Sequence, residues 1–225
     1  MKNSIEISKK IQKDTENICL KFNFWMNEYT NKIEDSNLKI KIVKQTDALL
    51  FKFISIGINL EHLWEIRYEK KCLFREKNTN TKEWENPNSF IDLVFLENTV
   101  IQVRSFIDFA QKLSCLVLGY EKNFIGTKGF YKVLNKIDND KAKKILNKFQ
   151  EILTEGNWGS TVKSIRDKIS HYDIIKTNSE YLPVIQKMNY EDFCQNLENN
   201  VFVLLCDLNE ILFEKKWVAG YVNYI

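Results

Sequence analysis

The sequence predicts an all-α protein, an antiparallel helical bundle, on three observations. Its 225 residues include only seven Gly and two Pro, too few for the many turns of an all-β fold. Apolar residues make up 44% of the chain, enough for a sizeable core. They recur mostly at three-, four- and seven-residue steps, which is typical of amphipathic helices.

The first third of the chain predicts two helices. Residues 4–30 carry their Ile and aromatic side chains on one face, and the polar segment 31–39 breaks that pattern. A second, largely buried helix is expected from about Gln45 to Lys70. We therefore assign residues 1–75 to N-terminal helices packed on the bundle, and the polar stretch EKNTNTKEWEN, residues 76–86, to a linker.

The remainder, residues 87–216, is predicted to form the helical core, with a short C-terminal tail to residue 225. Pro87 suits the first position of a helix, which we expect to run to a C-cap at Gly119. A loop with two glycines and a short helix follow. Further helices are expected over residues 139–154, over the segment around residue 166, and from near residue 189 onward.

Charge and cysteine usage limit the classes of function. The net charge is +3, but residues 121–148 hold eight Lys against three acidic residues, which permits a basic face. The five Cys are scattered and form no CxxC pair. Cys115, Cys194 and Cys206 lie in apolar helical patterns, so we expect them to be small buried side chains in a reducing compartment. The polar N-terminus and the short apolar runs predict a cytoplasmic protein with no membrane partner.

One stretch, SIRDKISHYDII at residues 164–175, carries candidate chemistry. The chain has four Arg and two His, and two of these scarce residues, Arg166 and His171, stand five apart here. A guanidinium matches phosphate oxygens, and imidazole exchanges a proton near neutral pH. RNA supplies its own nucleophile, the 2′-hydroxyl, so these two side chains suffice to cut RNA with no metal and no cofactor. Asp167 could orient one of them, and Tyr172 could donate a hydrogen bond or stack on a base.

Spacing alone leaves simpler interpretations open. Five residues on an ideal helix turn about 140° beyond a full turn, so the pair shares a face only if the helix bends or ends between them. A second copy in a symmetric dimer could instead complete the site. The simplest alternative is a histidine favoured by the negative end of a helix, with Lys163 and Lys168 as solvent-exposed neighbours rather than RNA ligands.

Arg104 and Asp108 form a second candidate pair, four residues apart on one face of the long helix. We expect an intrahelical ion pair at the bundle surface. The functional alternative is a supporting pair that aims His171 or adds positive charge for a phosphate.

The order Arg166, Asp167, three residues, His171 resembles the ribonuclease motif of the HEPN superfamily, the higher eukaryotes and prokaryotes nucleotide-binding domain. The helix expected at residues 103–119 is also similar to a HEPN helix, and the resemblance covers about residues 87–216. It implies a metal-independent endoribonuclease that acts as a homodimer. Arg would hold the phosphate and His would assist attack by the 2′-hydroxyl, leaving 2′,3′-cyclic phosphate and 5′-hydroxyl ends.

The resemblance also implies a biological setting. Prokaryotic HEPN proteins commonly act as toxins or in phage defence, often with a nucleotidyltransferase antitoxin as partner. In that paired group a Tyr follows the His by two positions, whereas Tyr172 follows His171 directly. The alternative functions are a non-catalytic helical module that binds RNA or protein, and a structural subunit of a larger assembly.

Overall fold

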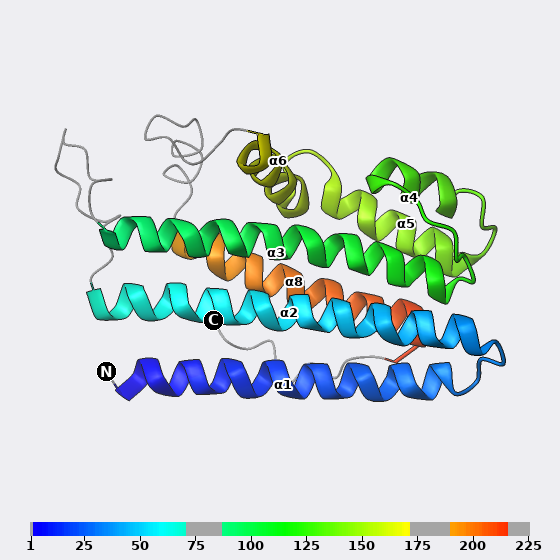
Figure 1. Cartoon of the computed structure of the whole chain (residues 1–225), viewed down its shortest axis with the longest axis horizontal. Coiled ribbons are helices and arrows are strands. Elements are labelled where there is room, and N and C mark those ends of the chain that lie inside the picture. Colours follow the sequence, from blue (N-terminus) through cyan, green and yellow to red (C-terminus); the bar gives the residue numbers. More distant parts are fainter. Residues whose placement is uncertain (1, 71–86, 172–189, 216–225) are drawn as a thin grey trace.

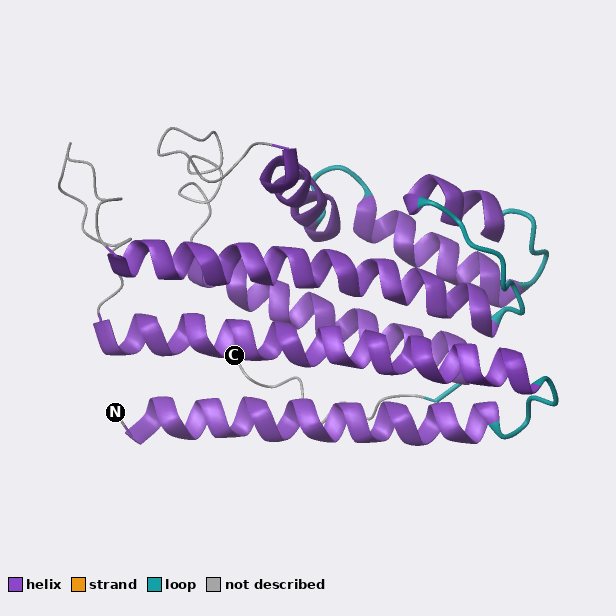
Figure 2. Ribbon diagram, in the orientation of Figure 1, coloured by secondary structure: helices purple, strands orange, loops and turns teal. Residues whose placement is uncertain are grey.

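A computed structural model describes residues 2–70, 87–171 and 190–215, and all regular structure in these ranges is helical (Figure 2). The predicted all-α class is confirmed. The helices are α1 (Lys2–Thr30), α2 (Ser36–Lys70), α3 (Pro87–Val117), α4 (Gly126–Leu134), α5 (Asp140–Leu153), α6 (Trp158–His171) and α8 (Tyr190–Phe213).

The three long helices α1, α2 and α3 lie side by side in one layer, and α8 lies behind them (Figure 1). α2 packs between α1 and α3, while α8 contacts all three and α5. The shorter helices close the far side of α3, where α4 and α6 both pack against it and α5 contacts α4 and α6. The first two helices therefore share one core with the rest of the bundle.

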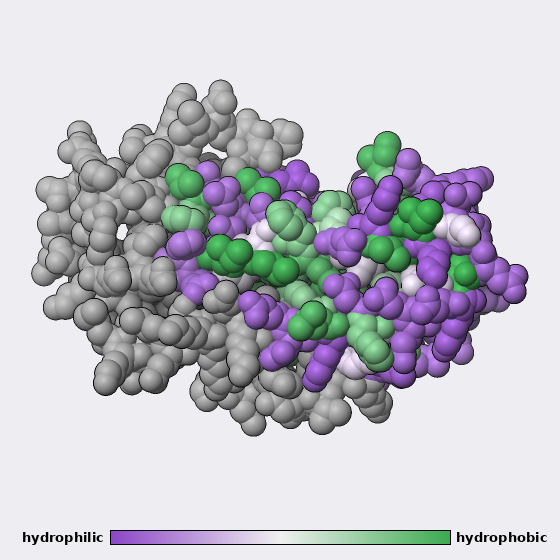
Figure 3. All heavy atoms as spheres, turned by 60° about the horizontal axis from the view of Figure 1, so that its bottom comes forward, coloured by the Kyte–Doolittle hydropathy of each residue, from purple (hydrophilic) through white to green (hydrophobic). Residues whose placement is uncertain are grey.

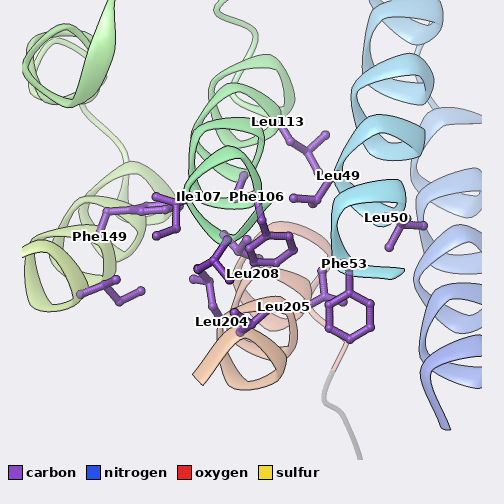
Figure 4. Close-up of a cluster of buried hydrophobic side chains, with 14 of the residues drawn as sticks. Leu49, Leu50, Phe53, Phe106, Ile107, Leu113, Phe149, Leu204, Leu205 and Leu208 are labelled. Atoms are coloured by element: carbon purple, nitrogen blue, oxygen red, sulfur yellow. The ribbon is translucent and has the colours of Figure 1, made fainter. Parts of the chain in front are cut away.

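Large apolar side chains from every layer meet in that core (Figure 4). Phe106 of α3 and Phe149 of α5 are fully buried, and Phe149 meets Phe130 of α4 edge to face, with ring centroids 5.0 Å apart. Burying one such side chain stabilises the fold by roughly 1.5–3 kcal/mol. The core therefore fixes how α3, α4 and α5 sit relative to one another.

The second helix begins at Ser36, nine residues before the start expected from the sequence. Asp35 caps it, because its Oδ1 accepts hydrogen bonds from the backbone N–H groups of Asn37 at 2.8 Å and Leu38 at 3.2 Å. The polar segment 31–39 that indicated a break includes Ser36 and Asn37, which are exposed in the first turn of α2.

The predicted end of the long helix α3 is confirmed. Gly119 has φ +79°, and the backbone N–H of Tyr120 donates to the Cys115 carbonyl at 2.8 Å. The N–H of Gly119 donates to the Leu116 carbonyl at 2.9 Å, which completes a Schellman motif. The hydroxyl of Tyr29 donates to the Val117 carbonyl at 3.0 Å and ties α1 to this end of α3.

Several expectations lie outside the described residues: the linker at residues 76–86, Tyr172, and the tail beyond residue 215. Cys115 is buried, as expected, and burial raises the pKa of its thiol to about 12. Among the helices that the structure describes, none combines the length and apolar character needed to span a bilayer.

Candidate functional site

Helix α6, which carries the Arg166–His171 stretch, is held close against α3 and α5. Val162 and Ile165 are buried and form its inner face. At its start, a Cβ on Gly159 would lie 2.5 Å from Cγ2 of Ile152, so only glycine permits this approach of α6 to the end of α5. This packing fixes the position of the next residues of α6, Arg166 and Asp167, relative to α3 and α5.

Arg166 and Asp167 follow directly and are half-buried. Nη1 of Arg166 lies 3.1 Å from Oδ1 of Asp167, and their side chains are 33% and 41% exposed. An ion pair this open to water contributes less than about 1 kcal/mol. A guanidinium has five N–H donors and this one carboxylate takes few of them, so Arg166 remains able to bind an anion.

The second arginine of this region, Arg104, comes from the middle of α3. The predicted ion pair forms, with Nη2 of Arg104 2.8 Å from Oδ1 of Asp108. The expectation that it lies at the bundle surface is wrong for the arginine, whose side chain is only 6% exposed, whereas that of Asp108 is 37% exposed. α4 packs on α3, and Thr127 of α4 reaches the guanidinium, a tertiary contact that helix spacing cannot reveal.

Two nitrogens of Arg104 stay unpaired in this buried position. Its Nε and Nη1 have no hydrogen-bond partner among the described residues. Its Nη2 also approaches the hydroxyl Oγ1 of Thr127, at 3.5 Å, the long limit of a hydrogen bond. Leaving a buried donor unsatisfied costs about 1–3 kcal/mol. The described residues therefore supply fewer hydrogen-bond acceptors than the Arg104 guanidinium can use.

Asp108 links the two arginines electrostatically. Burial raises the pKa of the Asp108 carboxyl, and the positive charges of Arg104 and then Arg166 act in the opposite direction. Lys112 also lowers this pKa, and Asp167 raises it. The four residues Arg104, Asp108, Arg166 and Asp167 therefore form one electrostatic unit between α3 and α6, which we call the polar cluster.

The other predicted site residues are placed less fully. His171 is the last residue of α6, and Lys168 lies one turn earlier, but the structure describes only their backbones. Lys163 is exposed on the same helix. Because α6 stays helical from Arg166 to His171, the two residues leave it about 140° apart around its axis.

Thr127 is the member of this region that sequence reasoning missed. It is the second residue of α4, which contains both glycines of the loop predicted from the sequence, and its hydroxyl oxygen lies 3.5 Å from Nη2 of Arg104. Nearby, burial raises the pKa of Tyr131, with Arg104 acting against this rise. The Tyr131 hydroxyl donates to the Phe149 carbonyl at 3.1 Å, which holds the partly buried ring against the core.

Within the described ranges, no group of three or more His, Cys, Asp or Glu side chains is placed to hold a metal ion. No family model, curated protein or solved structure matches the chain. The HEPN resemblance therefore stays a prediction from the motif, and function is argued below from the site.

Proposed function

We propose that this protein is a metal-independent endoribonuclease of HEPN type whose active residues are Arg166 and His171. The observation that carries the proposal is the position of Arg166, which is one-third exposed and acts electrostatically on Asp108, the carboxylate paired with the buried Arg104. The polar cluster holds two positive and two negative charges, and the exposed Lys112, which also lowers the pKa of Asp108, adds one positive charge in excess. A phosphodiester carries one negative charge and would neutralise this excess.

The chemistry needs only the substrate and these side chains. Neutral His171 takes the proton of an RNA 2′-hydroxyl, whose oxygen then bonds to the adjacent phosphorus. Arg166 binds the phosphate oxygens and stabilises the charge that builds on them. The bond from phosphorus to the 5′-oxygen breaks, and that oxygen takes a proton from an imidazolium or from water. The products are a 2′,3′-cyclic phosphate and a 5′-hydroxyl.

A homodimer would allow Arg166 and His171 to act on one phosphate although they point in different directions on α6. On an ideal helix these two positions point about 140° apart, so we propose that a two-fold axis brings Arg166 of one copy near His171 of the other. A role as a toxin or in phage defence, in the cytoplasm and with an antitoxin or nucleotidyltransferase partner, belongs to the same proposal and is supported by the motif alone.

The test is cleavage of mixed single-stranded RNA and tRNA by the purified protein in EDTA. We expect His171→Ala and Arg166→Ala each to lose cleavage by at least about 100-fold. The matched control is His62→Ala, which removes the other histidine, an exposed residue of α2. An inert wild type, or active variants of both site residues, would contradict the proposal.

Mixing the two inactive variants tests the dimer. If Arg and His come from different copies, a mixed dimer of His171→Ala and Arg166→Ala contains one intact site of two. Half of the dimers are then mixed, so about a quarter of wild-type cleavage should return. If each chain supplies both residues, no activity returns, and the two-fold site is excluded while the ribonuclease proposal stands.

A second candidate, a non-catalytic module that binds protein, is favoured by exposed apolar side chains. Leu20 and Phe24 on α1 are 68% and 60% exposed. Ile40, Phe51, Ile54 and Ile58 lie on one face of α2 and are also exposed. Figure 3 shows a band of apolar side chains across the face that it brings forward. An inert wild type in the cleavage test would favour this candidate.

A further inference from the structure

A run of lysines without acidic neighbours in sequence covers the exposed face of α4. Residues 122–137 contain four Lys and no Asp or Glu. Three of these lysines stand four residues apart and are exposed, and we call them the lysine row: Lys128, Lys132 and Lys136. Since four residues make slightly more than one helical turn, the first two project from one face of α4 and the third follows just beyond its end.

The lysine row has no carboxylate partner in the part of the chain that the structure describes, where no ion pair involves any of the three. The acidic residues at the two ends of the run are paired with other lysines. Glu121 contacts Lys41, and Asp138 lies 3.1 Å from Nζ of Lys143. By contrast, three lysines of α5 each lie within 3.1 Å of a carboxylate oxygen: Lys141, Lys143 and Lys148.

Placing these charges together works against the stability of α4. Like charges four residues apart on a helix repel each other, as Lys128 and Lys132 do. Lys128 also lies in the first turn, where the positive end of the helix dipole disfavours a cation, and no acidic residue of that turn offsets it. An anion bound along the lysine row would relieve both repulsions. The row therefore has the charge, the exposure and the vacancy that a polyanion needs.

The lysine row begins close to the polar cluster. The hydroxyl oxygen of Thr127, the residue before Lys128, lies 3.5 Å from Nη2 of Arg104. Arg104 pairs with Asp108, on which the charge of Arg166 acts. From this point the row continues for about 12 Å along α4. A strand bound at Arg166 therefore has the start of the row within its reach.

We propose that the lysine row binds the backbone of a single-stranded RNA that is held at the Arg166–His171 site. The three ammonium groups contact phosphates of the strand outside the bond that is cut. The inference deepens the proposed function, on which the identity of the polyanion as RNA rests. Such contacts do not depend on base sequence and are sensitive to salt, because each one releases a counterion from the strand.

The test measures binding of a fluorescently labelled single-stranded RNA to the full-length His171→Ala variant, by anisotropy at several salt concentrations. The lysine row is neutralised by adding Lys128→Gln, Lys132→Gln and Lys136→Gln together. We expect the affinity to fall at least about tenfold. The slope of log affinity against log salt should become shallower by about 2, or about 0.7 for each lost contact. Arg at the same three positions should preserve the affinity, because Arg also binds phosphate.

A matched control makes the same change at three exposed lysines of α1, α2 and the turn between them: Lys21, Lys32 and Lys44. These elements lie on the opposite side of α3 from α4 (Figure 1). The control has the same net charge as the row variant, but it should lose no more than about twofold in affinity and keep the salt slope. Urea unfolding should show the row variant to be at least as stable as its parent, because repulsion within α4 is removed.

Absence of RNA binding, or equal losses of affinity in the row variant and the control, would overturn the inference. A second arm replaces RNA with vesicles of phosphatidylcholine and phosphatidylserine. Vesicle binding that needs the lysine row, with RNA binding that does not, would overturn the RNA assignment and indicate an anionic membrane surface. Neither arm needs cleavage. RNA binding through the row by a wild type that does not cut would support the inference while the ribonuclease proposal fails.

Discussion

The two arginines of the polar cluster lie on neighbouring helices but in opposite surroundings. Arg104 is 6% exposed in its side chain, pairs with Asp108 at 2.8 Å and has two nitrogens without a partner among the described residues. Arg166 is 33% exposed and pairs with Asp167, its neighbour in sequence, at 3.1 Å. One guanidinium is fixed inside the bundle, whereas the other can exchange its carboxylate for a ligand.

Because the two guanidinium groups differ in exposure, we expect Arg104 to matter for stability and Arg166 to matter for activity. A buried charge depends on its single carboxylate, because water does not replace a lost partner. A half-exposed charge depends little on its carboxylate, because water solvates it when the pair opens. Changes around Arg104 should therefore affect stability first, and changes at Arg166 should affect activity first.

The largest effect is expected at Arg166. Arg166→Ala removes the phosphate ligand and should lower the rate of RNA cleavage by at least about 100-fold. It should leave the free energy of unfolding within about 1 kcal/mol of wild type, because the lost ion pair is partly exposed. Cleavage rates and urea unfolding, measured on the same samples, check both halves. An Arg166→Ala variant that loses stability but keeps its activity would contradict the expectation that Arg166 serves activity and Arg104 serves stability.

Gly159→Ala tests whether α6 must lie as close to α5 as the structure places it. The new Cβ would meet Cγ2 of Ile152 at 2.5 Å and its carbonyl oxygen at 2.9 Å. We expect a loss of about 2–3 kcal/mol in the free energy of unfolding. Urea unfolding provides the measurement, with Gly129→Ala as control, because its Cβ would meet Phe124 no closer than 3.2 Å. Equal losses in both variants would contradict the tight packing of α6.

Asp108→Ala and Asp167→Ala compare the carboxylates of the two arginines. Asp108→Ala removes the acceptor that Nη2 of the buried Arg104 contacts at 2.8 Å and should cost about 1–2 kcal/mol in the free energy of unfolding. Asp167→Ala should change the free energy of unfolding by no more than about 0.5 kcal/mol. Chemical unfolding of both variants at neutral pH measures the difference, and the reverse order would show that Arg104 does not depend on Asp108.

The smallest effect is a pH dependence at Asp108. Burial raises the pKa of this carboxyl above its ordinary 3.8, so between that value and the raised pKa the folded state holds more protons than the unfolded state. The Asp108 contribution to stability is therefore greatest below pH 3.8 and falls as pH rises through the raised pKa. The stability of wild type minus that of Asp108→Asn should fall over this window. A difference that rises with pH would contradict the role of burial.

Local sequence signals were enough for most of the fold. The apolar spacing predicts the helices, and Gly119 marks the end of α3 because a left-handed residue closes its Schellman motif. The start of α2 was missed because its first turns are polar on the outside, although Asp35 is a recognisable N-cap. Helix ends with exposed outer faces show little apolar pattern to indicate them.

The polar cluster could be predicted only in part. A four-residue spacing places Arg104 and Asp108 on one face, but the buried position of Arg104 involves α4, which follows later in the chain. Thr127 joins Arg104 through the same long-range packing. An uncapped Ile125–Gly126 start is the one local signal that could have drawn attention to it.

The most direct test of the central claim uses a short RNA that the wild type cuts at one position, and the same RNA with a single 2′-deoxy nucleotide on the 5′ side of that position. The proposed chemistry predicts that the protein, in EDTA, cuts the first RNA to 2′,3′-cyclic phosphate and 5′-hydroxyl ends and leaves the second intact. Equal cleavage of both, or cleavage that EDTA abolishes, would contradict attack by the 2′-hydroxyl at the Arg166–His171 site.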